Sequence, residues 1–138
     1  MYENLSLYID GKFTSGSSSV TSDVINPAND AVLAKLPHAK KAELDAALAA
    51  ADKGFKEWKR VSAYERAKIL RKAADLVRER TEDIAKVLTQ EQGKILLEAR
   101  LEVQGAADII DWFAEEGRRA YGRIIPARAE GVRNMVIM

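Results

Sequence analysis

The stretch Leu88–Val103, LTQEQGKILLEARLEV, decides the fold, because a Gly-Lys pair separates two strongly helical segments. A Gly-Lys pair can belong to a phosphate-binding loop, which requires the pattern GxxxxGK followed by Ser or Thr. Here the nearest preceding glycine is Gly54, and Ile95 follows the lysine. Glycine is also the residue that most often ends a helix in a left-handed backbone conformation. The sequence therefore predicts that one helix ends at Gly93 and another begins near Ile95.

Helical periodicity extends outward from this break and covers residues 38–122. Ser62 and Glu65 form the pattern of a capping box, which starts a helix by satisfying its free backbone N–H groups. Polar residues that can cap the start of a new helix follow Arg80, so we expect the helix to be interrupted there. The last long helix is predicted from about Ile95 to Tyr121. An amphipathic stripe precedes them all and comprises Leu44, Ala47, Leu48, Ala51 and Phe55.

Residues 1–37 have the alternating pattern and turn residues of short strands. Asp10-Gly11 is a two-residue hairpin signal, and Asn26-Pro27 interrupts the next extended run. An apolar strand is expected at residues 131–138, with an exposed edge. We therefore predict an α+β chain with short N-terminal β-hairpins, three to four long helices and a terminal strand. These elements do not close one core, so the chain is expected to be the opening part of a larger protein.

The composition excludes several classes of function. The 22 basic and 21 acidic residues nearly balance, which argues against binding to nucleic acid or to an anionic membrane surface. The absence of cysteine excludes thiol nucleophiles and thiolate zinc sites within the chain. No apolar run approaches the roughly 20 residues of a membrane helix, and no secretory signal is recognisable at the N-terminus. A cytoplasmic location is therefore the expectation.

No active site is evident from residue spacing alone. Glu98 and Glu102 lie four residues apart on one expected helix face. Paired carboxylates can perform acid–base chemistry, but on an exposed helix they more often form a solvated surface. No glycine-rich dinucleotide fingerprint is present either. We therefore predict no catalytic and no cofactor-binding residue in this chain.

The order of several motifs nevertheless resembles the N-terminal part of NAD(P)-dependent aldehyde dehydrogenases. These motifs are LYIDGKF (7–13), INPANDAVLAKLP (25–37), the segment 58–94 that ends in EQGK, and IDWFAEEGRRAYGRIIP (110–126). The last of them is most similar to the succinate-semialdehyde dehydrogenase branch. The resemblance implies a fragment of a three-part α/β fold. Residues 1–138 would be the N-terminal part of the cofactor-binding region, and 131–138 would begin the strand of the oligomerisation arm.

The same resemblance implies an oxidoreductase that converts an aldehyde into a carboxylic acid with NAD or NADP. Succinate semialdehyde is the candidate substrate, and a homo-oligomer is the expected assembly. The family's nucleophilic cysteine, its general-base glutamate and its cofactor-binding lysine lie in motifs that this sequence does not contain. We therefore expect residues 1–138 alone to be inactive and to bind no cofactor tightly.

Two sets of residues receive roles from the resemblance. Ala106, Ile110 and Phe113 would line the tunnel through which the aldehyde enters, although plain core packing would explain them equally well. Ile25, through its carbonyl, and Glu91 would bind a monovalent cation, since alkali cations prefer oxygen ligands. The alternative to an enzyme segment is a free-standing helical interaction module without catalysis. Such a module would pair through its exposed strand and helix faces.

Overall fold

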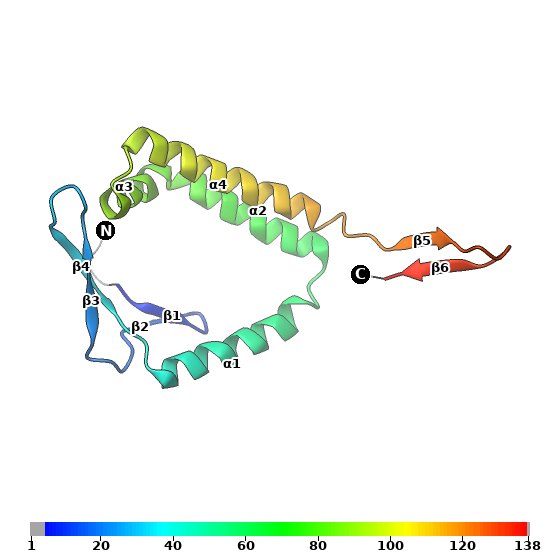
Figure 1. Cartoon of the computed structure of the whole chain (residues 1–138), viewed down its shortest axis with the longest axis horizontal. Helices are drawn as coiled ribbons and strands as arrows, with labels where there is room; N and C mark the ends of the chain where they lie inside the picture. The colour runs from blue at the N-terminus through cyan, green and yellow to red at the C-terminus, as the bar shows by residue number, and fades with distance from the viewer. Residues whose placement is uncertain (1–4, 138) are drawn as a thin grey trace.

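The computed structural model describes residues 5–137, which form an open ring with one projecting hairpin (Figure 1). The described residues form three separate antiparallel hairpins and four helices, so the predicted α+β class is confirmed. In chain order the elements are β1 (Leu7–Ile9), β2 (Lys12–Thr14), β3 (Thr21–Ile25), β4 (Val32–Pro37), α1 (Lys41–Trp58), α2 (Ala63–Glu79), α3 (Thr81–Gln92), α4 (Leu96–Glu116), β5 (Arg123–Pro126) and β6 (Arg133–Val136).

The predicted turn between β1 and β2 is confirmed. Asp10 and Gly11 both have positive φ values, of 50° and 76°, as a two-residue turn of the type favoured in hairpins requires. Leu7 then pairs with Thr14 and Ile9 with Lys12. A second hairpin, β3–β4, follows and turns at Asn26, whose N–H donates to the carbonyl of Ala31 at 2.9 Å.

Glu43 joins the loop after β2 to the start of α1. Its Oε1 accepts from the N–H of Ser17 at 2.8 Å, and its Oε2 accepts from the N–H of Lys40 at 2.9 Å. The Ser17 side chain first, and then the backbone N–H of Lys40, hold the pKa of Glu43 below its usual value. The helix thus begins at Lys41, with a carboxylate from its first turn satisfying backbone donors.

The core is a seam of small side chains between α4 and its two neighbours, α2 and α3. Val103 is the only buried residue larger than alanine among the described positions. Around it and Ala85 pack the half-buried side chains of Val77, Leu88 and Leu96. The buried alanines are Ala67 and Ala74 on α2, Ala85 on α3, and Ala99, Ala107 and Ala114 on α4.

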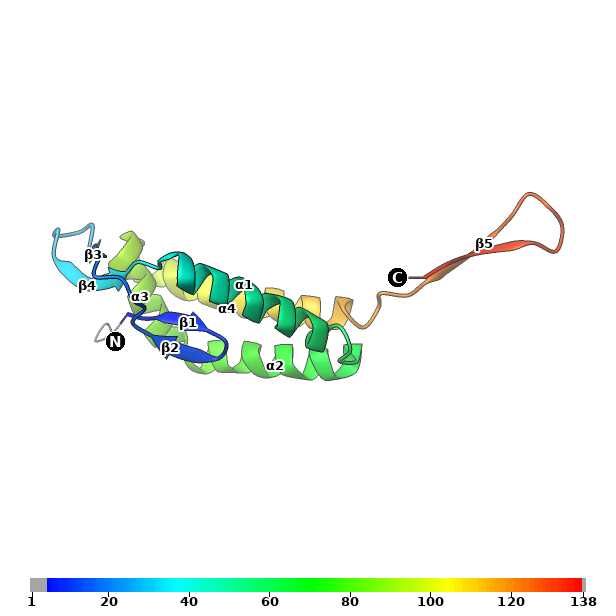
Figure 2. The same ribbon diagram turned by 90° about the horizontal axis from the view of Figure 1, so that it is seen from below.

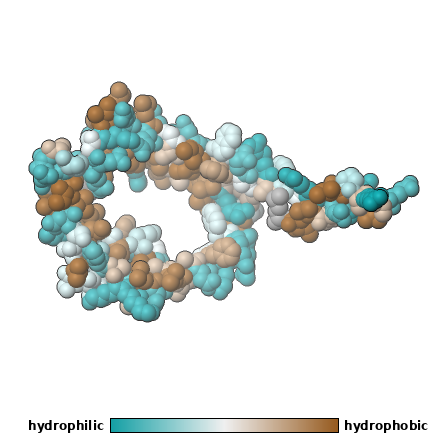
Figure 3. Space-filling view, viewed as in Figure 1, coloured by the Kyte–Doolittle hydropathy of each residue, from teal (hydrophilic) through white to brown (hydrophobic). Residues whose placement is uncertain are grey.

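Helix α1 lies across the ring from this seam, and its main contact is with β1 (Figures 1 and 2). No residue of α1 is buried, and its predicted apolar stripe is open to solvent: Leu48 is 70% and Phe55 63% exposed. The space-filling view shows an opening between α1 and the α2–α4 pair, with apolar side chains along parts of its rim (Figure 3). The amphipathic helix was predicted correctly, but residues 5–137 do not cover its apolar face.

Three expectations for the C-terminal third need correction. Helix α4 ends at Glu116 and not near Tyr121, because glycine with its low helix propensity follows at Gly117. The chain then becomes extended, and Ile124 and Ile125 belong to a strand, β5, that was not predicted from the sequence. This strand pairs with β6, so one edge of the predicted terminal strand is occupied. Met138 lies outside the described residues.

Two glycines of the helices have different surroundings. Gly105, in the interior of α4, is not at a close helix contact, because a Cβ added to it would meet no described atom within 4 Å. Gly93 behaves as predicted: it caps α3 in the left-handed conformation, with φ of 78°. A Cβ on Gly93 would lie only 3.1 Å from Cγ of Pro27, so the end of α3 touches the turn between β3 and β4.

These two glycines provide a matched test of the fold. Gly93→Ala places a side chain on a left-handed residue and against Pro27, so we expect it to lower the free energy of unfolding by about 1–2 kcal/mol. Gly105→Ala removes a flexible residue from the interior of α4 and should raise that free energy by about 0.5–1 kcal/mol. Urea unfolding monitored by circular dichroism would measure both. Equal effects of the two substitutions would contradict the proposed role of Gly93.

Candidate functional site

The three residues predicted to line a tunnel lie on one face of α4. Ala106, Ile110 and Phe113 follow each other at steps of four and three residues, which is the spacing of a helix face. Ile110 is half-buried, whereas Ala106 is exposed and the side chain of Phe113 is 62% exposed. Phe113 therefore has little role in the core that the described residues form. Its ring is available to a ligand or to further polypeptide.

A depression of about 330 Å³ lies beside Phe113, where the end of α1, the first turns of α2 and the end of α4 meet. Its wall includes the apolar side chains of Trp58, Leu70 and Phe113 and one cation, Arg66. The sequence analysis did not single out Arg66. A signal was present, however, because Arg66 falls on the same helical stripe as Leu70 and Ala73, where an apolar residue is expected.

The two predicted cation ligands lie on elements that touch. Ile25 is the last residue of β3 and is 45% exposed, and Glu91 lies in the last turn of α3. The contact between Pro27 and Gly93 brings these two chain segments together. Within residues 5–137, no cluster of three or more acidic or histidine side chains could hold a metal ion. A cation here would depend on carbonyl oxygens as well as on Glu91.

Several charged residues of the helices form ion pairs that join one element to the next, and others pair within one helix. Lys94 pairs with Glu102, and this hydrogen bond raises the pKa of the Lys94 ammonium. The ammonium is thus held by a carboxylate of this chain, while the preceding Gly93 caps α3 as predicted. Glu102 belongs to the same ion pair and is not a free general base.

Two further arginines join the helices. The guanidinium of Arg78 on α2 donates to Asp108 at 2.9 Å and to Asp111 at 2.6 Å, both on α4. Arg100 on α4 donates to both carboxylate oxygens of Glu82 on α3, at 2.6 and 3.0 Å. The hydrogen bond from Arg100 lowers the pKa of Glu82. These carboxylates act as structural partners on the surface of the bundle.

The histidine of the chain also has a partner. His38 Nε2 lies 2.6 Å from the hydroxyl oxygen of Ser22, on the hairpin formed by β3 and β4. Both residues are exposed, and no described acid bonds to the other ring nitrogen of His38. A serine nucleophile needs an oriented base and an oxyanion hole, so this pair does not constitute a catalytic site.

In the described part of the chain, no helix is long and apolar enough to cross a bilayer.

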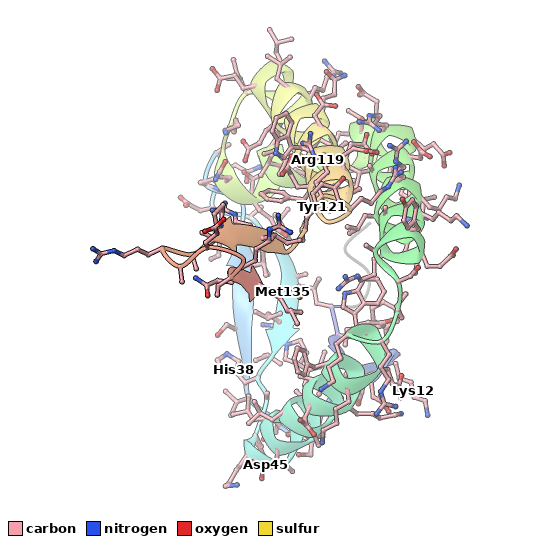
Figure 4. All side chains as sticks on the ribbon, turned by 90° about the vertical axis from the view of Figure 1, so that its right-hand side faces the viewer. Lys12, His38, Asp45, Arg119, Tyr121 and Met135 are labelled. Atoms are coloured by element: carbon pink, nitrogen blue, oxygen red, sulfur yellow. The ribbon has the colours of Figure 1, made fainter. Side chains whose placement is uncertain are left out.

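The hairpin of β5 and β6 projects from the end of α4, away from the ring (Figure 2). Arg119 and Tyr121 lie where the chain leaves α4, and Met135 lies on β6 (Figure 4). All residues of both strands are exposed, including Ile124 at 66% and Met135 at 72%. An isolated two-stranded hairpin is at best marginally stable in water, so its apolar side chains require a partner.

Comparison with known proteins explains this open architecture. Residues 13–138 match the model of the aldehyde dehydrogenase family. The chain is 44% identical to 3-sulfolactaldehyde dehydrogenase of Pseudomonas putida, a match that covers 86% of the chain and 24% of that protein. It is 41% identical to the NADP-dependent succinate-semialdehyde dehydrogenase of Escherichia coli K12, covering 94% of the chain and 27% of that enzyme.

The solved structures agree with the sequence matches. The crystal structure of an aldehyde dehydrogenase from Brucella melitensis biovar abortus 2308 superposes with a TM-score of 0.87 at 41% identity, covering 93% of this chain and 26% of that one. The chain thus spans about a quarter of the length of the relatives that it matches. The exposed faces of α1, α4 and the hairpin lie on an architecture that continues in those relatives. This chain belongs to the aldehyde dehydrogenase family.

Proposed function

We propose that this chain is the N-terminal region of an enzyme that oxidises an aldehyde to a carboxylic acid with NAD or NADP. The observation that carries the proposal is the match over nearly the whole chain, at 41–44% identity, to dehydrogenases of aldehydes. The nicotinamide cofactor would supply the hydride acceptor when bound by the complete enzyme. Residues 1–138 contain no cysteine to attack the aldehyde, so the chain alone is proposed to be inactive.

The proposed substrate is an aldehyde that carries an anionic group, with succinate semialdehyde as the first candidate. The names of two relatives support this class, because sulfolactaldehyde carries a sulfonate and succinate semialdehyde a carboxylate. Within this chain, the face of α4 formed by Ala106, Ile110 and Phe113 is proposed to line the entrance for the aldehyde. Its support is the exposed ring of Phe113 beside an apolar depression.

The hairpin of β5 and β6 is proposed to be an oligomerisation arm that pairs with a second subunit. Its support is the exposure of Ile124, Met135 and Val136 on a ribbon that has no other part of the described chain beside it (Figure 1). Addition of a strand to a free sheet edge supplies main-chain hydrogen bonds and buries such side chains. A homo-oligomer is therefore the proposed assembly, and a cytoplasmic location stays an expectation.

The Ile25 carbonyl and Glu91 are proposed to bind Na⁺ or K⁺ in the complete enzyme. The support is the contact between the β3–β4 turn and the end of α3, which holds both residues on adjoining segments. The cation would connect the N-terminal hairpins to helix α3. Its role would be structural, and no step of the oxidation would involve it.

A chimera tests the proposed function directly. We expect this chain, put in place of the matching region of the E. coli succinate-semialdehyde dehydrogenase, to give an enzyme that reduces NADP with succinate semialdehyde. Phe113→Ala in the chimera should change KM for the aldehyde and leave KM for NADP unchanged. The isolated chain should produce no NADH or NADPH. A folded chimera without turnover, together with a stable isolated chain on sizing chromatography, would instead favour the interaction module.

The proposed arm can be tested through its glycines. A Cβ on Gly122 would lie 2.4 Å from the carbonyl oxygen of Val136, so Gly122→Ala should separate β5 from β6. We expect this variant of the chimera to form smaller oligomers in light scattering coupled to sizing chromatography. Gly131→Asn is the control, because Gly131 has open space around it and asparagine tolerates its positive φ of 75°. An unchanged oligomer in Gly122→Ala would contradict the role of the arm.

The proposed cation site predicts that Na⁺ or K⁺ raises the thermal stability of the protein. This effect should require the carboxylate of Glu91. A ligand that binds only the folded state raises its stability. NaCl or KCl should therefore raise the Tm of the chimera above its value in choline chloride at equal ionic strength. Glu91→Gln should abolish the difference, whereas Glu98→Gln on α4 should retain it. If Glu91→Gln kept the full difference, the cation would bind elsewhere.

A further inference from the structure

Arg66 is a half-buried cation without an acceptor. Its backbone N–H donates to the carbonyl of Ser62 within the first turn of α2, but its guanidinium bonds to no carboxylate or carbonyl in the described part of the chain. The other arginines of α2 and α4 are paired with carboxylates, namely Arg71, Arg78 and Arg100. A guanidinium that is partly withdrawn from water is costly unless an acceptor satisfies it.

The side chains around Arg66 restrict the kind of group that can accept a hydrogen bond from its guanidinium. The cation lies in a depression beside the ring of Trp58, which is 40% exposed, and the half-buried side chain of Leu70. A group that covers Trp58 and Leu70 must be apolar over a wide surface and must offer a hydrogen-bond acceptor to Arg66. A small anionic aldehyde that passes the face of α4 at Phe113 would leave the ring of Trp58 in water. Polypeptide with one carboxylate side chain satisfies both requirements.

We infer that Arg66 is the anchor at which the remainder of the enzyme docks onto this region, through an Asp or Glu flanked by apolar side chains. The inference rests on the proposed function, under which a complete enzyme about four times as long as this chain covers the exposed helix faces. The carboxylate and guanidinium would form the hydrogen-bonded centre of that contact, and Trp58 and Leu70 its apolar rim. Arg66 is a positioning residue and touches no reacting atom.

The test compares the same substitution in two settings. In the isolated chain, Arg66→Gln should leave the thermal transition unchanged, because no acceptor is lost. In the chimera or the complete enzyme, it should lower Tm by about 3 °C or more, because a carboxylate is left unpaired. Arg66→Lys should restore part of this loss. Arg60→Gln, an exposed cation in the turn between α1 and α2, is the control and should have no effect in either setting.

Three outcomes would overturn the inference. An equal loss of Tm in the isolated chain would place the acceptor within residues 1–138. An unchanged Tm in the complete enzyme would exclude a docking role. An unchanged Tm with a raised KM for succinate semialdehyde, but not for a neutral aldehyde, would make Arg66 a substrate-binding residue. The wild-type chimera's own turnover separates these outcomes from failure of the proposed function, because the Tm comparison needs only a folded protein.

Discussion

The close approach of α2 and α3 to α4 depends on the alanine seam. Every buried residue there except Val103 is an alanine, so the backbones can come together with little side chain between them. Cores that are this tightly closed tolerate added methylene groups poorly, at a cost of about 1–3 kcal/mol. The seam also determines the direction of the larger side chains on α4. With alanines facing inward, the large apolar residues of α4, such as Leu101 and Trp112, are directed outward.

Ion pairs on the edges of the seam set the positions of the helices along one another. Arg78 fixes α2 against α4, and Arg100 fixes α4 against α3. Alanine contacts alone discriminate poorly between neighbouring alignments, because one small side chain replaces another when a helix slides. Directional hydrogen bonds to guanidinium groups remove that freedom. The exposure of Arg78 and Arg100 means that their contribution is to alignment more than to stability.

Much of this architecture was predictable because its signals are local. The hairpin at Asp10-Gly11, the cap at Ser62 and the left-handed Gly93 each depend on a few consecutive residues, and the structure confirms all three. The C-terminal limit of α4 was predicted wrongly, because helical periodicity continued in the sequence beyond Gly117, where the helix ends. The strand β5 was missed, because its pairing with the later strand β6 leaves no local signal. Interactions between distant residues cannot be recognised from periodicity.

The candidate site was predictable only through the family resemblance. Nothing in the spacing of Ala106, Ile110 and Phe113 distinguishes a tunnel wall from a core face. Arg66 was overlooked because a single charge on an apolar stripe is a weak signal until the neighbouring helix end is in place. The physical reason is the same in both cases. A site composed of residues from several elements has no pattern of its own in the linear sequence.

The isolation of α1 has a consequence for how the protein is made. Helices α2, α3 and α4 contact one another within residues 63–116, so they form a unit of mainly local contacts, which fold quickly. Helix α1 leaves the ribosome before them and meets α2 and α4 only at its C-terminal end, near Trp58. Its stripe of Leu44, Leu48 and Phe55 is exposed in the described chain. Under the proposed function, the first helix to be made would therefore keep its apolar face in water until later parts of the enzyme are synthesised and cover it.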